Sequence, residues 1–174
     1  MKKSDIRPLP EYFDRYITLV EDIELEEAFQ NSIKDLTDLD IPLLNKIGSR
    51  TYQQGKWEIK EIIQHISDIE RILTAGTLCF VRNENKHIIT FNEEEIARNS
   101  KAKNKNLTDI IDELISIRKS TLSLYQSFDK DDLLKTGINW KYEISVLAMG
   151  FNIIGHQTHH LNFIKSNYYP LLRP

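Results

Sequence analysis

The sequence is poor in cysteine, proline and glycine. Its 174 residues include one cysteine, Cys79, five prolines and six glycines. A single cysteine excludes an intramolecular disulfide and a cysteine-rich zinc site, and it is typical of proteins from a reducing compartment. No proline occurs between residues 43 and 169. Because proline breaks the interior of a helix, its absence favours long helices across this region.

Long apolar runs and an excess of positive charge are also missing. No stretch approaches the roughly 18 uncharged apolar residues of a membrane-spanning helix, and the polar start of the chain lacks the apolar run of a signal peptide. Lys and Arg number 23 against 26 Asp and Glu, a net charge of −3. We therefore expect a cytoplasmic protein that binds neither nucleic acid nor membrane. The length predicts a single domain.

Four segments have apolar residues at helical spacing. They cover about residues 23–36, 57–81, 107–128 and 143–167, whereas no alternating run is strong enough to predict a sheet; the nearest is 16–20. The polar segment 82–106 is long enough to run back along a helix. The pattern therefore predicts an all-α four-helix bundle with a long crossover between its second and third helices, which then run parallel. A short helical turn near residues 93–99 fits within this crossover.

Three of the five histidines lie close together near the C-terminus, at positions 156, 159 and 160. His156 and His160 are four residues apart, so they share one apolar helix face, while His159 lies to the side. His65 occupies the apolar stripe of the second helix. Three imidazoles that converge from two helices favour a divalent metal site over the alternative, hydrogen-bonded histidines in the core.

Two other metal sites fit the sequence less well. The spacing of His156 and His160 matches the H-E-x-x-H pattern of zinc proteases, but Gln157 replaces the glutamate and cannot act as a general base. A carboxylate-bridged di-iron site needs two Glu-x-x-His motifs. The only such motif, Glu84 to His87, lies in the polar crossover, where a solvated loop is expected.

Two carboxylates flank His65 on the second helix. Glu61 precedes it by one turn, and Asp68 follows it by three residues. Either side chain is a candidate for orienting the imidazole or for accepting a proton. Both are equally explained as solvated partners of Lys60 or Arg71.

Several motifs resemble the DinB/YfiT-like family over nearly the whole chain. They are G-K-W-E-I-K-E-I at 55–62, H-x-x-D-x-E-R at 65–71, F-N-E-E at 91–94 and G-H-Q-T-H-H at 155–160. The resemblance implies a DinB-like four-helix bundle over residues 1–174, with an N-terminal extension of about residues 1–21. It also implies a homodimer and one divalent metal ion per chain, held by His65, His156 and His160.

A three-histidine site leaves the ion its full charge and a vacant position, as in catalytic centres. That position takes either a thiol, whose pKa falls, or water, whose pKa falls toward about 7. Members of the family are described as metal-dependent hydrolases, and one branch as thiol S-transferases that use bacillithiol, mycothiol or glutathione. We expect transfer of a small thiol to an electrophile, with zinc or nickel bound. The alternatives are a hydrolase that uses Glu61 or Asp68, and a non-catalytic module for binding or dimerisation.

Overall fold

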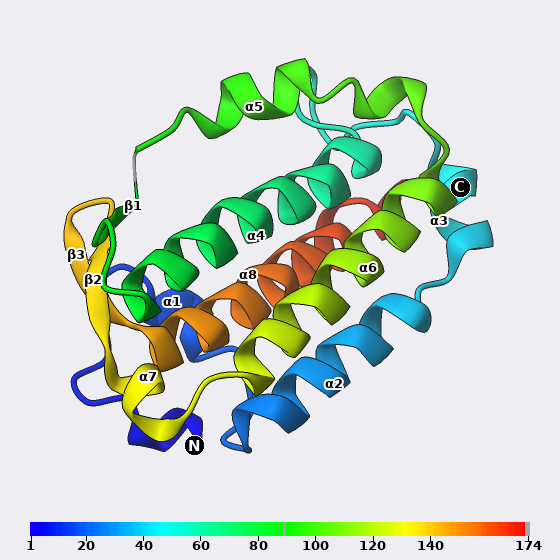
Figure 1. Ribbon diagram of the computed structural model, residues 1–174. Coiled ribbons are helices and arrows are strands. Elements are labelled where there is room, and N and C mark those ends of the chain that lie inside the picture. Colours follow the sequence, from blue (N-terminus) through cyan, green and yellow to red (C-terminus); the bar gives the residue numbers. More distant parts are fainter. Residues whose placement is uncertain (89, 173–174) are drawn as a thin grey trace.

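Four long helices form the body of the computed structural model, which describes residues 1–88 and 90–172. They are α2 (Leu25–Thr37), α4 (Ile59–Val81), α6 (Leu107–Gln126) and α8 (Val146–Asn167). Figure 1 shows that α4 and α6 run in one direction, whereas α2 and α8 run in the other. The predicted bundle, with its second and third long helices parallel, is confirmed.

The parallel arrangement requires a long connection, and residues 82–106 supply it. This segment contains β1 (His87–Ile88), α5 (Glu93–Asn99) and the 3-10 turn η2 (Ala102–Asn104). It leaves the end of α4, passes over the outer side of that helix and reaches the start of α6 (Figure 1). The helical turn expected near residues 93–99 is present as α5.

A small sheet lies at one end of the bundle, so the expectation of no sheet is wrong. Its strands follow the order β1, β2 (Thr136–Asn139) and β3 (Tyr142–Ser145), with β1 parallel and β3 antiparallel to β2. Residues 143–145 therefore belong to a strand and not to the last helix. Strands of two to four residues are too short to show an alternating pattern in the sequence.

Shorter helices cover the ends and one side of the bundle. They are η1 (Lys3–Asp5), α1 (Asp14–Ile17), α3 (Ile41–Ile47), α7 (Lys130–Leu134) and η3 (Tyr169–Leu172). The N-terminal helix α1 packs directly on α8. At this contact a Cβ atom on Gly155 would lie 2.0 Å from the backbone oxygen of Tyr16, so glycine is required for the close approach. No described helix combines the length and apolar character that crossing a membrane demands.

The core consists of two apolar clusters separated by a polar layer. One cluster includes Phe29, Leu73 and Phe151, and the other includes Ile63 and Leu114. On every long helix, the change from one cluster to the other falls at a buried polar residue: Ser32, Ser67, Arg118 and Gln157. This layer places polar side chains at the middle of the bundle, where apolar packing alone would otherwise continue.

Candidate metal centre

Three histidine rings meet inside the bundle, next to this polar layer. His65 comes from α4, and His156 and His160 come from successive turns of α8. One ring nitrogen of each lies within 4.8 Å of the other two, and the Nε2 atoms of His156 and His160 are 3.0 Å apart. Nitrogens that share a tetrahedral ion at 2.0–2.1 Å are about 3.3 Å apart. The cluster is thus close to the geometry of a shared ion.

Burial keeps all three rings neutral near pH 7. His65 and His156 are only 2% and 7% exposed. Burial lowers the pKa of His65 to about 4. Burial, together with the neighbouring histidines, lowers the pKa of His160 to about 3 and holds that of His156 well below its usual value. Neutral imidazole is the form that binds a metal ion, because its unprotonated nitrogen has a free lone pair.

The hydrogen bonding of the cluster also fits a metal ion. Nδ1 of His65 is buried and has no hydrogen-bond partner among the described residues. An unsatisfied buried polar atom destabilises the folded state. A metal ion that coordinates ring nitrogens of this cluster would give them a partner. Imidazole donors suit zinc, nickel, copper and iron. The three residues therefore fit a divalent transition-metal ion.

Two further polar residues of the G-H-Q-T-H-H motif, His159 and Gln157, point elsewhere. His159 is exposed and packs edge-on against Tyr16, with ring centroids 5.3 Å apart. Gln157 is buried and donates a hydrogen bond of 2.9 Å to the backbone oxygen of Ser32. The first side chain lies beside the cluster, and the second connects α8 to α2.

Both carboxylates that flank His65 in the sequence have structural partners. Glu61 accepts a hydrogen bond of 2.8 Å from the backbone amide of Glu58 at the start of α4, and lies 3.4 Å from Nζ of Lys103. Asp68 accepts a hydrogen bond of 3.0 Å from Gln64, and burial raises its pKa. Neither side chain lines the cavities that reach the histidines.

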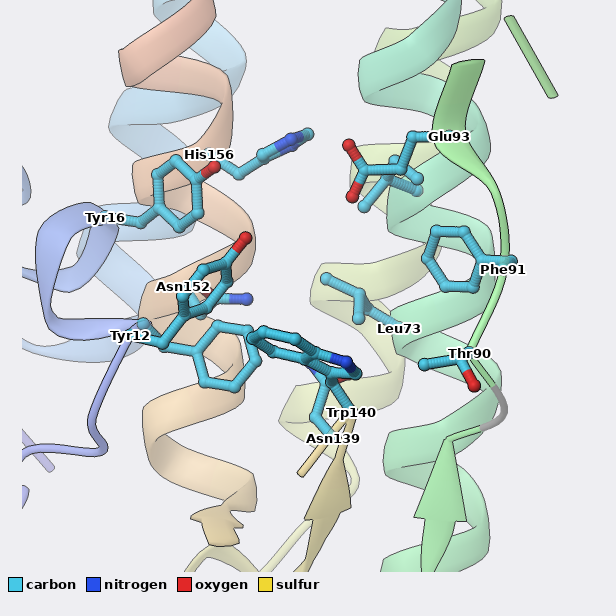
Figure 2. A pocket seen from close by; sticks show the side chains of 12 residues that line it. Tyr12, Tyr16, Leu73, Thr90, Phe91, Glu93, Asn139, Trp140, Asn152 and His156 are labelled. Carbon is cyan, nitrogen blue, oxygen red and sulfur yellow. The ribbon is translucent and has the colours of Figure 1, made fainter. Parts of the chain in front are cut away.

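Two cavities reach the histidine cluster. The first, of about 190 Å³, is lined by His156 together with aromatic residues and Glu93. The second, of about 260 Å³, is lined by His160, Trp57 and Lys56. Figure 2 shows that the Glu93 carboxylate and the His156 ring point toward one another across the first cavity. Burial raises the pKa of Glu93, against the effect of nearby Arg15.

Several residues of the first cavity were not predicted from the sequence. Asn152 lies one helical turn before His156, so the same four-residue spacing that pairs His156 with His160 would have placed it on this face. Tyr12 and Trp140 lie in turns, and Glu93 comes from the crossover. No periodic pattern identifies residues of this kind.

A buried ion pair lies beside the histidine cluster. The guanidinium of Arg118 on α6 binds both carboxylate oxygens of Glu70 on α4, with Nε–Oε1 and Nη2–Oε2 distances of 2.9 Å. Arg118 also donates a hydrogen bond to the hydroxyl of Ser32 on α2. These contacts join the three helices beside the histidines. Arg118 was not predicted from the sequence, although its position four residues after Leu114, on the apolar face of α6, could have identified it.

Together the fold and site define a helical bundle with a buried three-histidine cluster. The model of the DinB superfamily matches residues 13–164. The chain therefore belongs to the DinB superfamily, as the resemblance of its motifs implied. A curated protein of Oceanobacillus iheyensis, named "Putative metal-dependent hydrolase OB0413", is 25% identical over 118 residues, which cover 67% of this chain and 68% of that protein.

Solved structures agree with this fold. YfiT from Bacillus subtilis, described as a probable metal-dependent hydrolase with an unusual four-helix bundle topology, superposes with a TM-score of 0.68 and 14% identity, over 92% of this chain and 88% of that one. A mycothiol-dependent maleylpyruvate isomerase superposes with a TM-score of 0.58 and 11% identity, over 92% of this chain and 62% of that one. At these identities, the likeness establishes the fold.

Proposed function

We propose that the protein is a cytoplasmic metal-dependent enzyme that transfers a low-molecular-weight thiol to an electrophilic substrate. His65, His156 and His160 hold one divalent ion, zinc or nickel. The observation that carries this proposal is that the cluster is reached from two cavities, one beside His156 and one beside His160. A reaction between two organic molecules needs two such sites, whereas hydrolysis needs room for one molecule and water.

The linings of the cavities suggest which substrate each accepts. Lys56 and Glu94 both line the cavity beside His160, so the ammonium group of Lys56 can pair with a carboxylate, and Glu94 with the amino group, of a thiol such as glutathione. The cavity beside His156 has no lysine or arginine among its described lining residues and suits an uncharged or cationic electrophile. When bound, the divalent ion would lower the pKa of a thiol placed between the cavities.

The chain's own residues then position the reactants and accept a proton. The neutral imidazoles would leave the charge of the ion uncompensated. The sulfur forms a bond to the electrophilic carbon, and the leaving group departs with its bonding electrons. Glu93, which faces His156 across the cavity, is placed to accept the thiol proton.

Hydrolysis is the second candidate function, and the same carboxylate favours it. A hydrolase needs a base near the ion to take a proton from water. Glu93 meets this requirement better than Glu61 or Asp68, because it lines the cavity and they do not. The names of OB0413 and YfiT also support hydrolysis, since each describes a metal-dependent hydrolase.

A direct screen separates these two reactions. Protein loaded with zinc or nickel is incubated with 1-chloro-2,4-dinitrobenzene and, in turn, glutathione, bacillithiol and cysteine. A parallel panel contains nitrophenyl esters and anilides. We expect turnover with at least one thiol and none in the ester and anilide panel, and we expect His156→Ala to abolish it. Turnover only in the second panel would establish hydrolysis instead.

A further inference from the structure

One segment of the crossover lines both cavities that reach the histidine cluster. Thr90, Phe91 and Glu93 line the first cavity, and the next residue, Glu94, lines the second. Apart from α4 and α8, which carry the histidines, α5 is the only described helix or strand that contributes to both linings. Figure 2 shows the first three of these residues on the side of the first cavity opposite α8. The segment 90–99 therefore forms a wall of each cavity.

Few contacts hold this segment in place. Within the described part of the chain, a single hydrogen bond joins residues 90–99 to a residue outside the crossover. None of their charged side chains forms an ion pair there, and of the ten residues only Ala97 is buried. Segments with few buried contacts open locally at a low cost in free energy.

Both ends of the segment, in contrast, are anchored. On one side, β1 pairs with β2, and Ile88 is buried against Gly76 of α4. On the other side, Ala102 of η2 is buried, and Nζ of Lys105 donates a hydrogen bond of 2.8 Å to Gln64 of α4. The weakly held residues thus lie between two fixed points, as in the loops and short helices that close over active sites.

The single hydrogen bond that leaves the segment comes from Trp57. Its Nε1 donates to the Glu94 carboxylate at 3.2 Å, and its ring centroid lies 5.0 Å from that of His65. The backbone oxygen of Trp57 accepts a hydrogen bond from the hydroxyl of Tyr168, whose side chain is buried. Trp57 is therefore fixed to the body of the bundle and connects α5 to the histidine cluster.

The cavities are small for the reaction that we propose. Their volumes of about 190 and 260 Å³ lie below the roughly 300–1,000 Å³ of most small-molecule sites. Transfer of a thiol requires two organic molecules to meet at one ion. Displacement of residues 90–99 removes a wall from each cavity, so one movement enlarges both.

We infer that residues 90–99 form a lid over the two cavities, with the hydrogen bond between Trp57 and Glu94 as its latch. The open lid admits the substrates to both cavities. The closed lid brings the Glu93 carboxylate to face His156, as it does in this structure. The inference deepens the proposed function, on which the role of the lid in the reaction rests, by adding the step that admits the reactants.

Thiol labelling of buried cysteines tests the lid. In a Cys79→Ser background, Ala97→Cys places the only thiol on the buried side of the lid, and Ala102→Cys places it in the anchored turn η2; the two alanines are 2% and 1% exposed. Labelling uses 5,5′-dithiobis(2-nitrobenzoate) with EDTA present. We expect Ala97→Cys to react at least about ten-fold faster, because its exposure requires only local opening. Equal rates would overturn the inference.

Substitution of the latch gives an independent test. In the Ala97→Cys protein, Glu94→Ala and Trp57→Phe each remove the hydrogen bond, and we expect each to accelerate labelling at least about five-fold. The matched control is Glu95→Ala, which removes the neighbouring exposed carboxylate from the same turn of α5 and should leave the rate unchanged. The rate for Ala102→Cys should not respond to either latch variant. An unchanged Ala97→Cys rate in both latch variants would contradict the inference.

The lid and the proposed function fail in different ways. Labelling with EDTA does not depend on the ion. If Ala97→Cys reacts fast and the wild type binds no zinc, the metal-dependent function is wrong and the lid stands. If zinc binds and Ala97→Cys reacts no faster than Ala102→Cys, the lid is wrong and the metal centre stands.

Discussion

The histidines of α8 have different environments although they lie within two turns of one helix. His156 and His160 face His65 across the bundle, with ring centroids 5.1 and 4.9 Å from it. His159 turns toward Tyr16 and solvent. The difference follows from helical geometry, because residues four apart share a face while a residue three away is rotated to its edge.

Alanine substitutions should reveal this difference in metal binding. His65→Ala and His156→Ala each remove a buried side chain that we propose as a metal ligand, and we expect them to abolish stoichiometric zinc binding, measured by calorimetry and by elemental analysis of protein purified without a histidine tag. His159→Ala serves as the matched control and should bind zinc almost as the wild type does. Equal loss in all three variants would show that the assignment of ligands is wrong.

Arg118 and Glu70 form a buried ion pair. Removing one partner of such a pair leaves an uncompensated charge in the core, which costs about 3–5 kcal/mol. We expect Glu70→Gln to reduce the free energy of unfolding by about 3 kcal/mol in urea denaturation. Glu113→Gln weakens the more exposed pairs with Arg71 and Lys105 and should cost no more than about 1 kcal/mol.

At the scale of elements, the packing of α1 on α8 shapes the first cavity. Tyr12 and Tyr16, which belong to this N-terminal region, line the cavity beside His156. Their position depends on Gly155, since the backbone oxygen of Tyr16 occupies the space of a Cβ atom there. The G-H-Q-T-H-H motif thus contains two histidines of the cluster and a glycine that leaves room for α1 to pack on α8.

Gly155→Ala should therefore destabilise the protein by about 3 kcal/mol, the upper end of the range for overpacking. Gly150→Ala on the same helix is the control. Its Cβ would meet side-chain atoms of Tyr125 and Leu25 at 2.9–3.1 Å, and these can shift, so we expect a loss of about 1 kcal/mol. Urea denaturation measures both. Equal losses would mean that the contact between α1 and α8 is not rigid.

The long helices could be predicted from the sequence because each has a sustained apolar period. The crossover also followed from its length and polarity, and the three convergent histidines followed from their places on apolar stripes. The sheet was not predictable, because strands of a few residues carry no period. The cavity residues Tyr12, Glu93 and Trp140 were missed because tertiary packing, and not local spacing, brings them to His156.

At the scale of the whole molecule, a polar layer crosses the bundle between two apolar clusters. The layer joins all the long helices and adjoins the histidine cluster. A metal ion bound only by the folded state would therefore stabilise the entire bundle and not one local segment.

Removal of the metal should lower the melting temperature. Saturation at 1,000 times the dissociation constant adds about 4 kcal/mol, and for a chain of this size that corresponds to about 8 °C or more. Calorimetry with zinc and with EDTA measures the difference, and His156→Ala should show none. An unchanged melting temperature in the wild type would favour the non-catalytic binding or dimerisation module.

The single domain over residues 1–174 and the homodimer both stay predictions. Within the chain, the segment 1–21 packs against α8. Analytical ultracentrifugation of the full chain checks the homodimer directly. A monomer at micromolar concentration would contradict it.

The histidines come from helices that are far apart in the chain, with the crossover and α6 between them. No partly folded segment can offer the complete set of imidazoles. An ion held by all three would therefore bind late in folding and would act chiefly by slowing unfolding of the native state. In a cell, the lifetime of this protein against proteolysis would then follow the supply of the ion more closely than the rate at which new chains fold.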